Sequence, residues 1–179
     1  LKFLYRKIAY LNEYTKRLLV SSLIQCHFDY ACSFWYPGLT KFWKDKLQVT
    51  QNKLIQFVLN LEHRCHIDQQ HFISLGWLAV SRRVEQITLC HVFKINNSQS
   101  PDCMGHLFVK QDSVHAYQTR SSQNGSFVPP KVKGFGLKSF SYWGCKLWNM
   151  LPPHIRQLPN ISSFKRAVKD HFLNDKSHC

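Results

Sequence analysis

Apolar side chains recur at intervals of three and four residues along most of the chain, which is the period of an amphipathic α-helix. Capping residues such as Asn12 and Thr40 precede apolar runs, and Pro37-Gly38 and Gly76 follow them. In the first part of the chain this pattern predicts helices over 1–11, from 12 towards 35, from 40 to about 58, and over 69–75, 81–95 and 101–107.

The apolar stripes of the second and third predicted helices indicate which residues form the core. In the second helix the stripe includes Leu23 and Ile24, and in the third it includes Trp43, Leu54 and Val58. Large apolar side chains at this spacing are expected to face a neighbouring helix. For the tryptophans, core packing is favoured over base stacking.

The character of the chain changes after residue 110. Residues 111–137 are rich in Ser, Gln, Gly and Pro, and Phe127-Val128-Pro129-Pro130 is typical of extended or edge-strand backbone. Helical spacing returns over 138–151 and 161–173. We therefore expect a mainly α fold, with a helical bundle over 1–110, an irregular or β-containing basic insert over 111–137, and a pair of carboxy-terminal helices over 138–179.

The charge of the chain points to a polyanionic partner. Its 179 residues include 24 Lys and Arg against 10 Asp and Glu, a formal net charge of +14. Residues 113–169 contain no Asp or Glu. An ordinary solvated surface mixes both signs, so this imbalance favours RNA or DNA as a partner. A basic face without any ligand is the alternative interpretation.

Bases, aromatic rings and glycines alternate in the segment Lys131-Val-Lys133-Gly134-Phe135-Gly136-Leu-Lys138, a combination suited to a nucleic-acid strand. We expect Phe135 and Tyr117 to stack on bases. The residues expected to neutralise phosphates are Arg120, Lys131, Lys133, Lys138 and Lys146, together with Lys41, Lys44 and Lys53 on the third predicted helix.

The seven cysteines are odd in number and irregularly spaced, which favours reduced, mostly buried thiols over a secreted disulfide framework. The apolar runs are far shorter than the ~20 residues needed to span a bilayer, so no membrane partner is expected. We expect an intracellular protein, in nucleus and cytoplasm as a ribonucleoprotein. Because residues 1–11 already have the pattern of a helix interior, we interpret the chain as a piece of a longer protein.

Several segments, in this order and spacing, form a recognisable set. They are 22–35 (SLIQCHFDYACSFW), 47–53 (LQVTQNK), 75–78 (LGWL), 117–120 (YQTR), 147–155 (LWNMLPPHI) and 164–169 (FKRAVK). As a set they resemble the region downstream of the palm in non-LTR (LINE-type) retrotransposon reverse transcriptases, which are RNA-directed DNA polymerases. The resemblance covers nearly the whole chain.

The resemblance implies a helical thumb-like region followed by the carboxy-terminal segment of the polymerase. In that family the thumb packs against the template–primer duplex, so element RNA, an RNA–DNA hybrid and the rest of the polymerase chain are the expected partners. The family's aromatic-Ala-Asp-Asp metal site is missing from this chain. The magnesium that the resemblance implies therefore belongs to the intact polymerase, and we expect no cofactor and no catalysis in this segment alone.

No other catalytic pattern stands out. The acidic residues are scattered, and Asp29, on an apolar helix, is expected to end that helix or to pair with an arginine. The cluster His63-Arg64-Cys65-His66 has metal-capable side chains, but its spacing does not match a paired zinc site, and we interpret it as a loop. Two other functions stay open: a protein-interaction module of amphipathic helices, and a non-functional relic of a decayed element.

Overall fold

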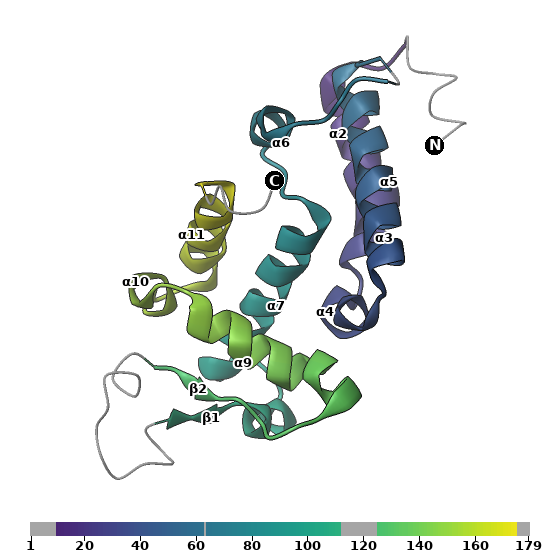
Figure 1. Cartoon of the computed structure of the whole chain (residues 1–179). Coiled ribbons are helices and arrows are strands. Elements are labelled where there is room, and N and C mark those ends of the chain that lie inside the picture. The colour runs from purple at the N-terminus through teal and green to yellow at the C-terminus, as the bar shows by residue number, and fades with distance from the viewer. Residues whose placement is uncertain (1–9, 63, 112–124, 175–179) are drawn as a thin grey trace.

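The computed structural model describes residues 10–62, 64–111 and 125–174. This part of the chain is mainly helical and contains one small antiparallel sheet of two short strands, which confirms the predicted fold class. Helix α7 (Val80–Asn96) runs through the middle, with a helical hairpin on one side and helix α11 (Ile161–Asn174) on the other (Figure 1).

The amino-terminal part is a helical hairpin. Its first arm consists of α2 (Glu13–Val20), the π-helical turn η2 (Ser21–Gln25) and α3 (Cys26–Asp29), and its second arm is α5 (Lys41–Leu59). The short helix α4 (Cys32–Trp35) and the 3₁₀ turn η3 (Tyr36–Gly38) connect them. The first arm begins as predicted, because the Asn12 side chain accepts a hydrogen bond from the Thr15 backbone N–H (2.8 Å).

The hairpin core lies between the two arms and the end of α6 (Gln69–Leu75). It consists of Val20, Leu54, Ile55, Phe57, Val58 and Leu75. Leu54 and Val58 are therefore buried as predicted.

Leu23, in contrast, is 55% exposed, so its predicted place in the core is wrong. The buried positions along the first arm are Lys16, Val20 and Gln25, a step of four residues followed by a step of five. A π-helical turn takes up one residue more than an α-helical turn and rotates the following positions around the axis. Turn η2 therefore brings Gln25 inward and Leu23 outward.

Glutamines of α5 position the start of α7. The Gln51 side chain donates to the Leu78 carbonyl (2.8 Å), and the Gln48 side-chain oxygen accepts from the Val80 backbone N–H (3.0 Å). Helix α6 ends at Gly76, as predicted, with a left-handed φ of 60° that favours glycine. These bonds fix the direction in which the chain enters α7.

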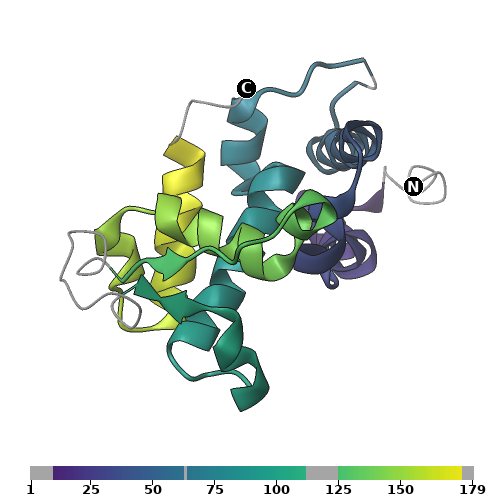
Figure 2. The same ribbon diagram turned by 60° about the horizontal axis from the view of Figure 1, so that its bottom comes forward.

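The carboxy-terminal part packs around α7. In chain order its elements are η4 (Asp102–Leu107), β1 (Val109–Lys110), β2 (Phe127–Val128), η6 (Gly134–Lys138), α9 (Phe140–Met150), α10 (Pro153–Arg156) and α11. Val109 pairs with Val128 and Lys110 with Phe127. Strand β2 contacts α9 (Figures 1 and 2). The Asn149 side chain bonds to both the N–H (2.9 Å) and the carbonyl (2.8 Å) of Phe127, so α9 holds this strand.

Aromatic rings fill the carboxy-terminal core. Trp148, 1% exposed, packs against Phe127 and Phe164, and Phe164 stacks on Phe93 of α7 at 4.5 Å between centroids. The indole N–H of Trp148 donates to the Gly125 carbonyl (3.0 Å), so its one polar group is satisfied. Rings from α7, α9, α11 and β2 thus form one continuous core.

Two further polar contacts join the hairpin to α7. The Arg83 guanidinium binds the Asp29 carboxylate with two donors (2.8 and 2.5 Å), and the Thr88 hydroxyl bonds to that of Ser33 (2.9 Å). The pair raises the pKa of Arg83, because it stabilises the charged form. Asp29 both ends α3 and pairs with an arginine, which confirms the structural role predicted for it.

Six cysteines in the described part of the chain are free thiols. Cys32 and Cys145 are buried, and burial raises the pKa of each thiol to about 11, whereas Cys26 and Cys103 are exposed. The expectation of mostly buried thiols is therefore right for only part of the set. Within the described residues no helix is both long and apolar enough to cross a membrane.

Candidate nucleic-acid interface

Turn η6 packs against turn η3, although about a hundred residues separate them in sequence. The Phe135 ring lies 3.5 Å from where a Cβ on Gly38 would stand. Because α5 begins directly after η3, this contact places the basic segment around η6 beside the first turns of α5. The spacing along the chain does not reveal this proximity.

Two glycines shape η6. Gly134 has a φ of +57°, which L side chains rarely adopt, and a Cβ on Gly136 would stand 2.9 Å from the Cβ of Val132. The pair Gly134-Phe-Gly136 therefore forms a tight turn that leaves Phe135 77% exposed at its tip. The stacking of Phe135 on a base stays a prediction.

Ammonium groups lie over aromatic rings on both sides of the η3–η6 contact. The Lys138 Nζ is 5.6 Å from the centroid of Phe135, and the Lys44 Nζ is 5.0 Å from that of Tyr36. Burial raises the pKa of Tyr36 to about 12, so its hydroxyl stays neutral beside the lysine. One cation–ring pair, Lys138 and Phe135, thus lies on the η6 side of the contact, and the other, Lys44 and Tyr36, on the η3 side.

Helix α5 adds two exposed rings in its first turn, next to Lys44 in sequence. Phe42 is 59% and Trp43 57% exposed, their centroids are 5.3 Å apart, and the Lys46 Nζ lies 5.3 Å from the Phe42 ring. The prediction that Trp43 packs in the core is wrong, because the first turns of α5 extend beyond the hairpin core. Trp148 is buried, and Trp77 and Trp143 pack at the edges of core clusters.

We call this region the α5–η6 surface. It consists of Lys41, Phe42, Trp43, Lys44, Lys46, Lys133, Phe135 and Lys138. Helix α5 contains a single acidic residue, Asp45, among these lysines. Among the described residues, no carboxylate forms a salt bridge with any of the five lysines of this surface.

The start of α5 is itself suited to an anion. Thr40 occupies the N-cap position, as predicted, but its side chain makes no capping hydrogen bond. The first-turn N–H groups therefore lack a side-chain acceptor from the cap, and the positive end of the helix dipole lies beside Lys41 and Lys44. Lysines at this end are unfavourable for the helix alone and become favourable when an anion binds between them.

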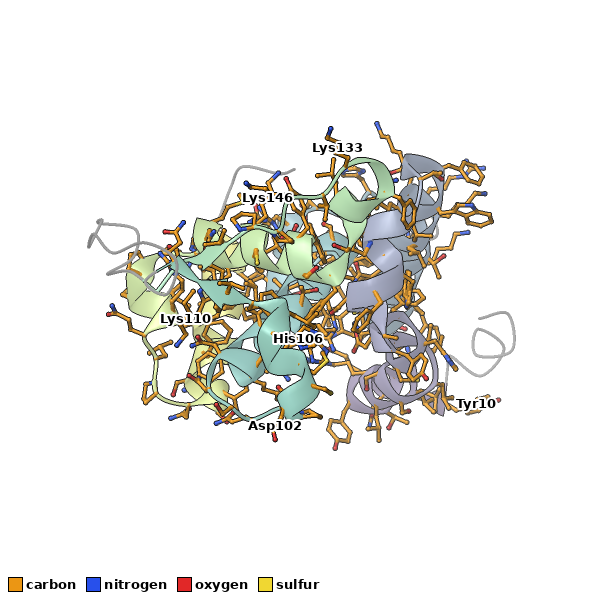
Figure 3. All side chains as sticks on the ribbon, turned by 90° about the horizontal axis from the view of Figure 1, so that it is seen from below. Tyr10, Asp102, His106, Lys110, Lys133 and Lys146 are labelled. Atoms are coloured by element: carbon orange, nitrogen blue, oxygen red, sulfur yellow. The ribbon has the colours of Figure 1, made fainter. Side chains whose placement is uncertain are left out.

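The other predicted contact residues are distributed around this surface. Lys131 is exposed just before η6, and Figure 3 shows Lys133 and Lys146 along the same edge of the molecule. Lys53 is exposed but lies about 14 Å along α5 from Lys44, at a rise of ~1.5 Å per residue, so it stands apart from the η3–η6 contact. Arg120 and Tyr117 lie outside the described residues.

Sequence reasoning missed Phe42, Trp43 and Lys46 as site residues. The available signal was the alternation of rings and cations in Lys41-Phe42-Trp43-Lys44, which repeats the character of the segment around η6. The acid-free stretch 113–169 is also less uniform than its composition indicates. Arg156 is buried and donates to the Ser126 hydroxyl (2.9 Å), so it belongs to the core rather than to a binding surface.

His71, which could in principle bind a metal ion, has a structural role instead. His71 belongs to a capping box with Asp68, in which its imidazole accepts from the Asp68 backbone N–H (3.2 Å) at the start of α6. The described residues hold no group of three or more His, Cys, Asp or Glu that could bind a metal ion. With Asp29 bound to Arg83, the described carboxylates do not fit the magnesium site implied for an intact polymerase.

The comparisons with known proteins add no family to this picture. No protein-family model matches the chain, and no curated protein or solved structure is significantly similar to it.

Proposed function

We propose that this chain is part of a non-LTR retrotransposon reverse transcriptase, downstream of the palm, and that its α5–η6 surface holds RNA or an RNA–DNA hybrid. The lysines neutralise backbone phosphates, and the exposed rings stack on unpaired bases at the edge of the bound strand. The family assignment rests on the sequence segments quoted above. The binding function rests on the surface itself.

One observation carries the binding proposal: lysines from α5 and η6 converge around exposed aromatic rings. Phe42, Trp43 and Phe135 are each more than half exposed, which is unfavourable for large apolar side chains in water. Lys46 lies over the Phe42 ring and Lys138 over the Phe135 ring. Lys44 directly follows Trp43 in the sequence. Stacking faces flanked by cations bind strands of any sequence, because every base has a π-face and every nucleotide a phosphate. The proposed binding is therefore independent of the nucleotide sequence.

Salt dependence tests the binding function. We expect the affinity for a labelled single-stranded RNA, measured by fluorescence anisotropy, to fall linearly on a log–log plot as salt rises. The slope is about −0.7 for each phosphate neutralised. The double variant Lys133→Gln/Lys138→Gln should flatten this slope by about 1.4.

A matched control removes two charges elsewhere. Arg64 and Lys110 are also exposed. Arg64 lies in the segment before α6 and Lys110 in β1, and Figure 3 shows Lys110 apart from Lys133, so Arg64→Gln/Lys110→Gln should leave the slope nearly unchanged. A folded wild-type chain that binds RNA without salt dependence, or equal effects of the two double variants, would contradict the proposal.

The family assignment has a separate test. If it is correct, the reading frame upstream of Leu1 in the genomic locus encodes an aromatic-Ala-Asp-Asp motif. The purified chain by itself should not extend a primer, whereas the longer protein should. A continuous upstream frame without that motif would remove the polymerase assignment and leave the binding function standing.

A protein-interaction module is the second candidate function. Helix α2 and turn η2 expose Tyr14 (75%), Leu18 (55%) and Leu23 (55%), an apolar face in solution. This face contains no lysine of the α5–η6 surface. If protein interaction is the main function, substitutions at Leu18 and Leu23 will abolish partner binding, and the lysine variants will have no effect.

A further inference from the structure

A second basic site lies on the side of α7 that faces α11, opposite to α5 (Figure 1). A cleft of about 360 Å³ opens between α7, α11 and the end of α6, and we call it the α7–α11 cleft. Four of its lining residues are basic: Arg83 from α7, and Lys165, Arg166 and Lys169 from α11. Acidic side chains are absent from its lining among the described residues. Its volume suits one phosphate group with its attached sugar.

The two walls of the cleft are held in place by the fold. The Gln86 side chain of α7 donates to the Lys165 carbonyl of α11 (2.9 Å), and Phe164, next along α11, is buried in the carboxy-terminal core. At the end of the cleft nearest to α6, the Lys169 Nζ lies 3.3 Å from where a Cβ on Gly76 would stand. The absence of a side chain at Gly76 therefore lets this ammonium approach the end of α6.

Arg83 enters the cleft already oriented. Asp29 accepts hydrogen bonds from its Nε and Nη2 groups, which fixes the plane of the guanidinium. Arginine presents five donors, so this pair leaves others for a ligand. A preoriented guanidinium on one wall and flexible ammonium groups on the other can contact a tetrahedral anion from several directions.

The basic side chains of α11 form no salt bridge within the described structure, although Asp170 follows Lys169 on the same helix. Lys165 and Lys169 are four residues apart on one helix face, where like charges repel each other. No carboxylate pairs with either lysine or with Arg166 in the described parts of the chain. Ser162, in the first turn of α11, adds a hydroxyl near the positive end of the helix dipole. An anion in the cleft would relieve this repulsion.

We propose that the α7–α11 cleft binds a phosphate group of a nucleic-acid strand, a second contact that rests on the proposed function of the α5–η6 surface. Figure 1 shows α5 and α11 on opposite sides of α7, so one nucleotide cannot occupy both sites. The phosphate is either the terminal monoester of a strand or an internal diester. The two sources share the same oxyanion chemistry and differ in charge.

Inorganic phosphate is the first probe, because it needs no nucleic acid. At constant ionic strength, kept with chloride, phosphate should raise the Tm of the wild-type chain, since a ligand that binds the folded state stabilises it. Lys165→Gln/Lys169→Gln should abolish this rise, while the surface pair Lys133→Gln/Lys138→Gln should retain it. In chloride alone the cleft variant should melt at or slightly above the wild-type Tm, because a repulsive pair is gone.

A second measurement identifies the source of the phosphate. A short 5′-phosphorylated oligonucleotide that binds several-fold tighter than its 5′-hydroxyl counterpart, with the difference lost in the cleft variant, assigns a terminal phosphate. Equal binding of the two, weakened several-fold by the cleft variant, assigns an internal phosphate.

The inference is overturned if phosphate raises the Tm no more than chloride, if the cleft variant keeps the rise, or if the cleft variant melts lower than the wild-type chain in chloride. Failure of the surface pair to weaken RNA binding would instead count against the α5–η6 surface and leave the phosphate result unaffected.

Discussion

The hairpin core and the carboxy-terminal core differ in how completely they are covered. The carboxy-terminal core is a closed set of stacked rings, with Trp148, Phe93 and Phe164 between 0 and 1% exposed. The hairpin core is smaller and mostly aliphatic, and the buried Lys16, 1% exposed, lies against its Phe57 ring. Around it, large apolar side chains such as Tyr14 and Trp43 lie in solvent.

This difference indicates a division of roles. A closed aromatic core makes the carboxy-terminal part the rigid body that fixes α7, and α7 holds the hairpin through Arg83–Asp29 and Thr88–Ser33. The hairpin uses a smaller core and leaves apolar and basic side chains free for contacts outside the chain. The exposed rings and cations of α5 are positioned by this scaffold and contribute little to it.

The largest loss of stability should follow from breaking the aromatic core. We expect Trp148→Ala to lower the free energy of unfolding by about 3–5 kcal/mol, because it removes a large buried ring and leaves a cavity among Phe127 and Phe164. Urea denaturation followed by far-UV circular dichroism measures this loss. A loss below about 1 kcal/mol would show that this core is loosely packed and would reverse the comparison.

Within the hairpin, two leucines that look alike in sequence should behave differently. Leu54→Ala should cost about 2–5 kcal/mol, because Leu54 is fully buried. Leu23→Ala should stay within about 0.5 kcal/mol, because Leu23 faces solvent after the η2 turn. Equal losses in thermal melts would mean that the first arm is a regular α-helix with Leu23 inward.

This pair shows what the sequence reveals and what it conceals. Local signals predicted the start of the first arm at Asn12 and the end of α6 at Gly76, because caps and glycine C-termini depend on neighbours along the chain. Which residues after Val20 face inward depends on the one extra residue in η2. A prediction from the regular period of an α-helix does not include that residue. The candidate lysines around η6 were predictable from charge, but their convergence with α5 depends on the distant contact between Gly38 and Phe135.

Substitution of Lys16 should have a smaller effect on stability than these losses, and it should stabilise the chain. Its Nζ bonds to the Asn60 side-chain oxygen and lies 5.6 Å from the Phe57 ring. No carboxylate in the described parts of the chain forms a salt bridge with it, and the charge of Glu13 offsets only part of the effect of burial. Burial lowers the pKa of Lys16 from its ordinary value of 10.5, because the charged form is poorly solvated there. Lys16→Met should therefore stabilise the chain modestly at neutral pH, because methionine has no charge to desolvate.

The sign of the pH dependence sharpens this prediction. Since the folded pKa is the lower one, the unfolded chain holds the Lys16 proton more tightly, and the Lys16 contribution to stability rises with pH. The advantage of Lys16→Met should be full below the folded pKa and shrink as the pH rises from there past 10.5, above which the wild-type lysine is neutral in both states. Urea midpoints of both proteins from neutral to alkaline pH measure it, and a constant difference would contradict burial of the charge.

The smallest change in stability should accompany a clear change in binding. Trp43 is 57% exposed on the α5–η6 surface, and Tyr14 is 75% exposed on α2, away from those lysines. We expect Trp43→Ala and Tyr14→Ala each to alter the free energy of unfolding by no more than about 0.5 kcal/mol. Only Trp43→Ala should weaken binding of a single-stranded RNA, by about 1–3 kcal/mol for one lost stacking contact. Because the ring carries no charge, the salt slope should stay the same while the affinity falls at every salt concentration. Equal losses from both substitutions would mean that the hairpin binds through general apolar exposure, and the distinction between a specific α5–η6 surface and the rest of the hairpin would be lost.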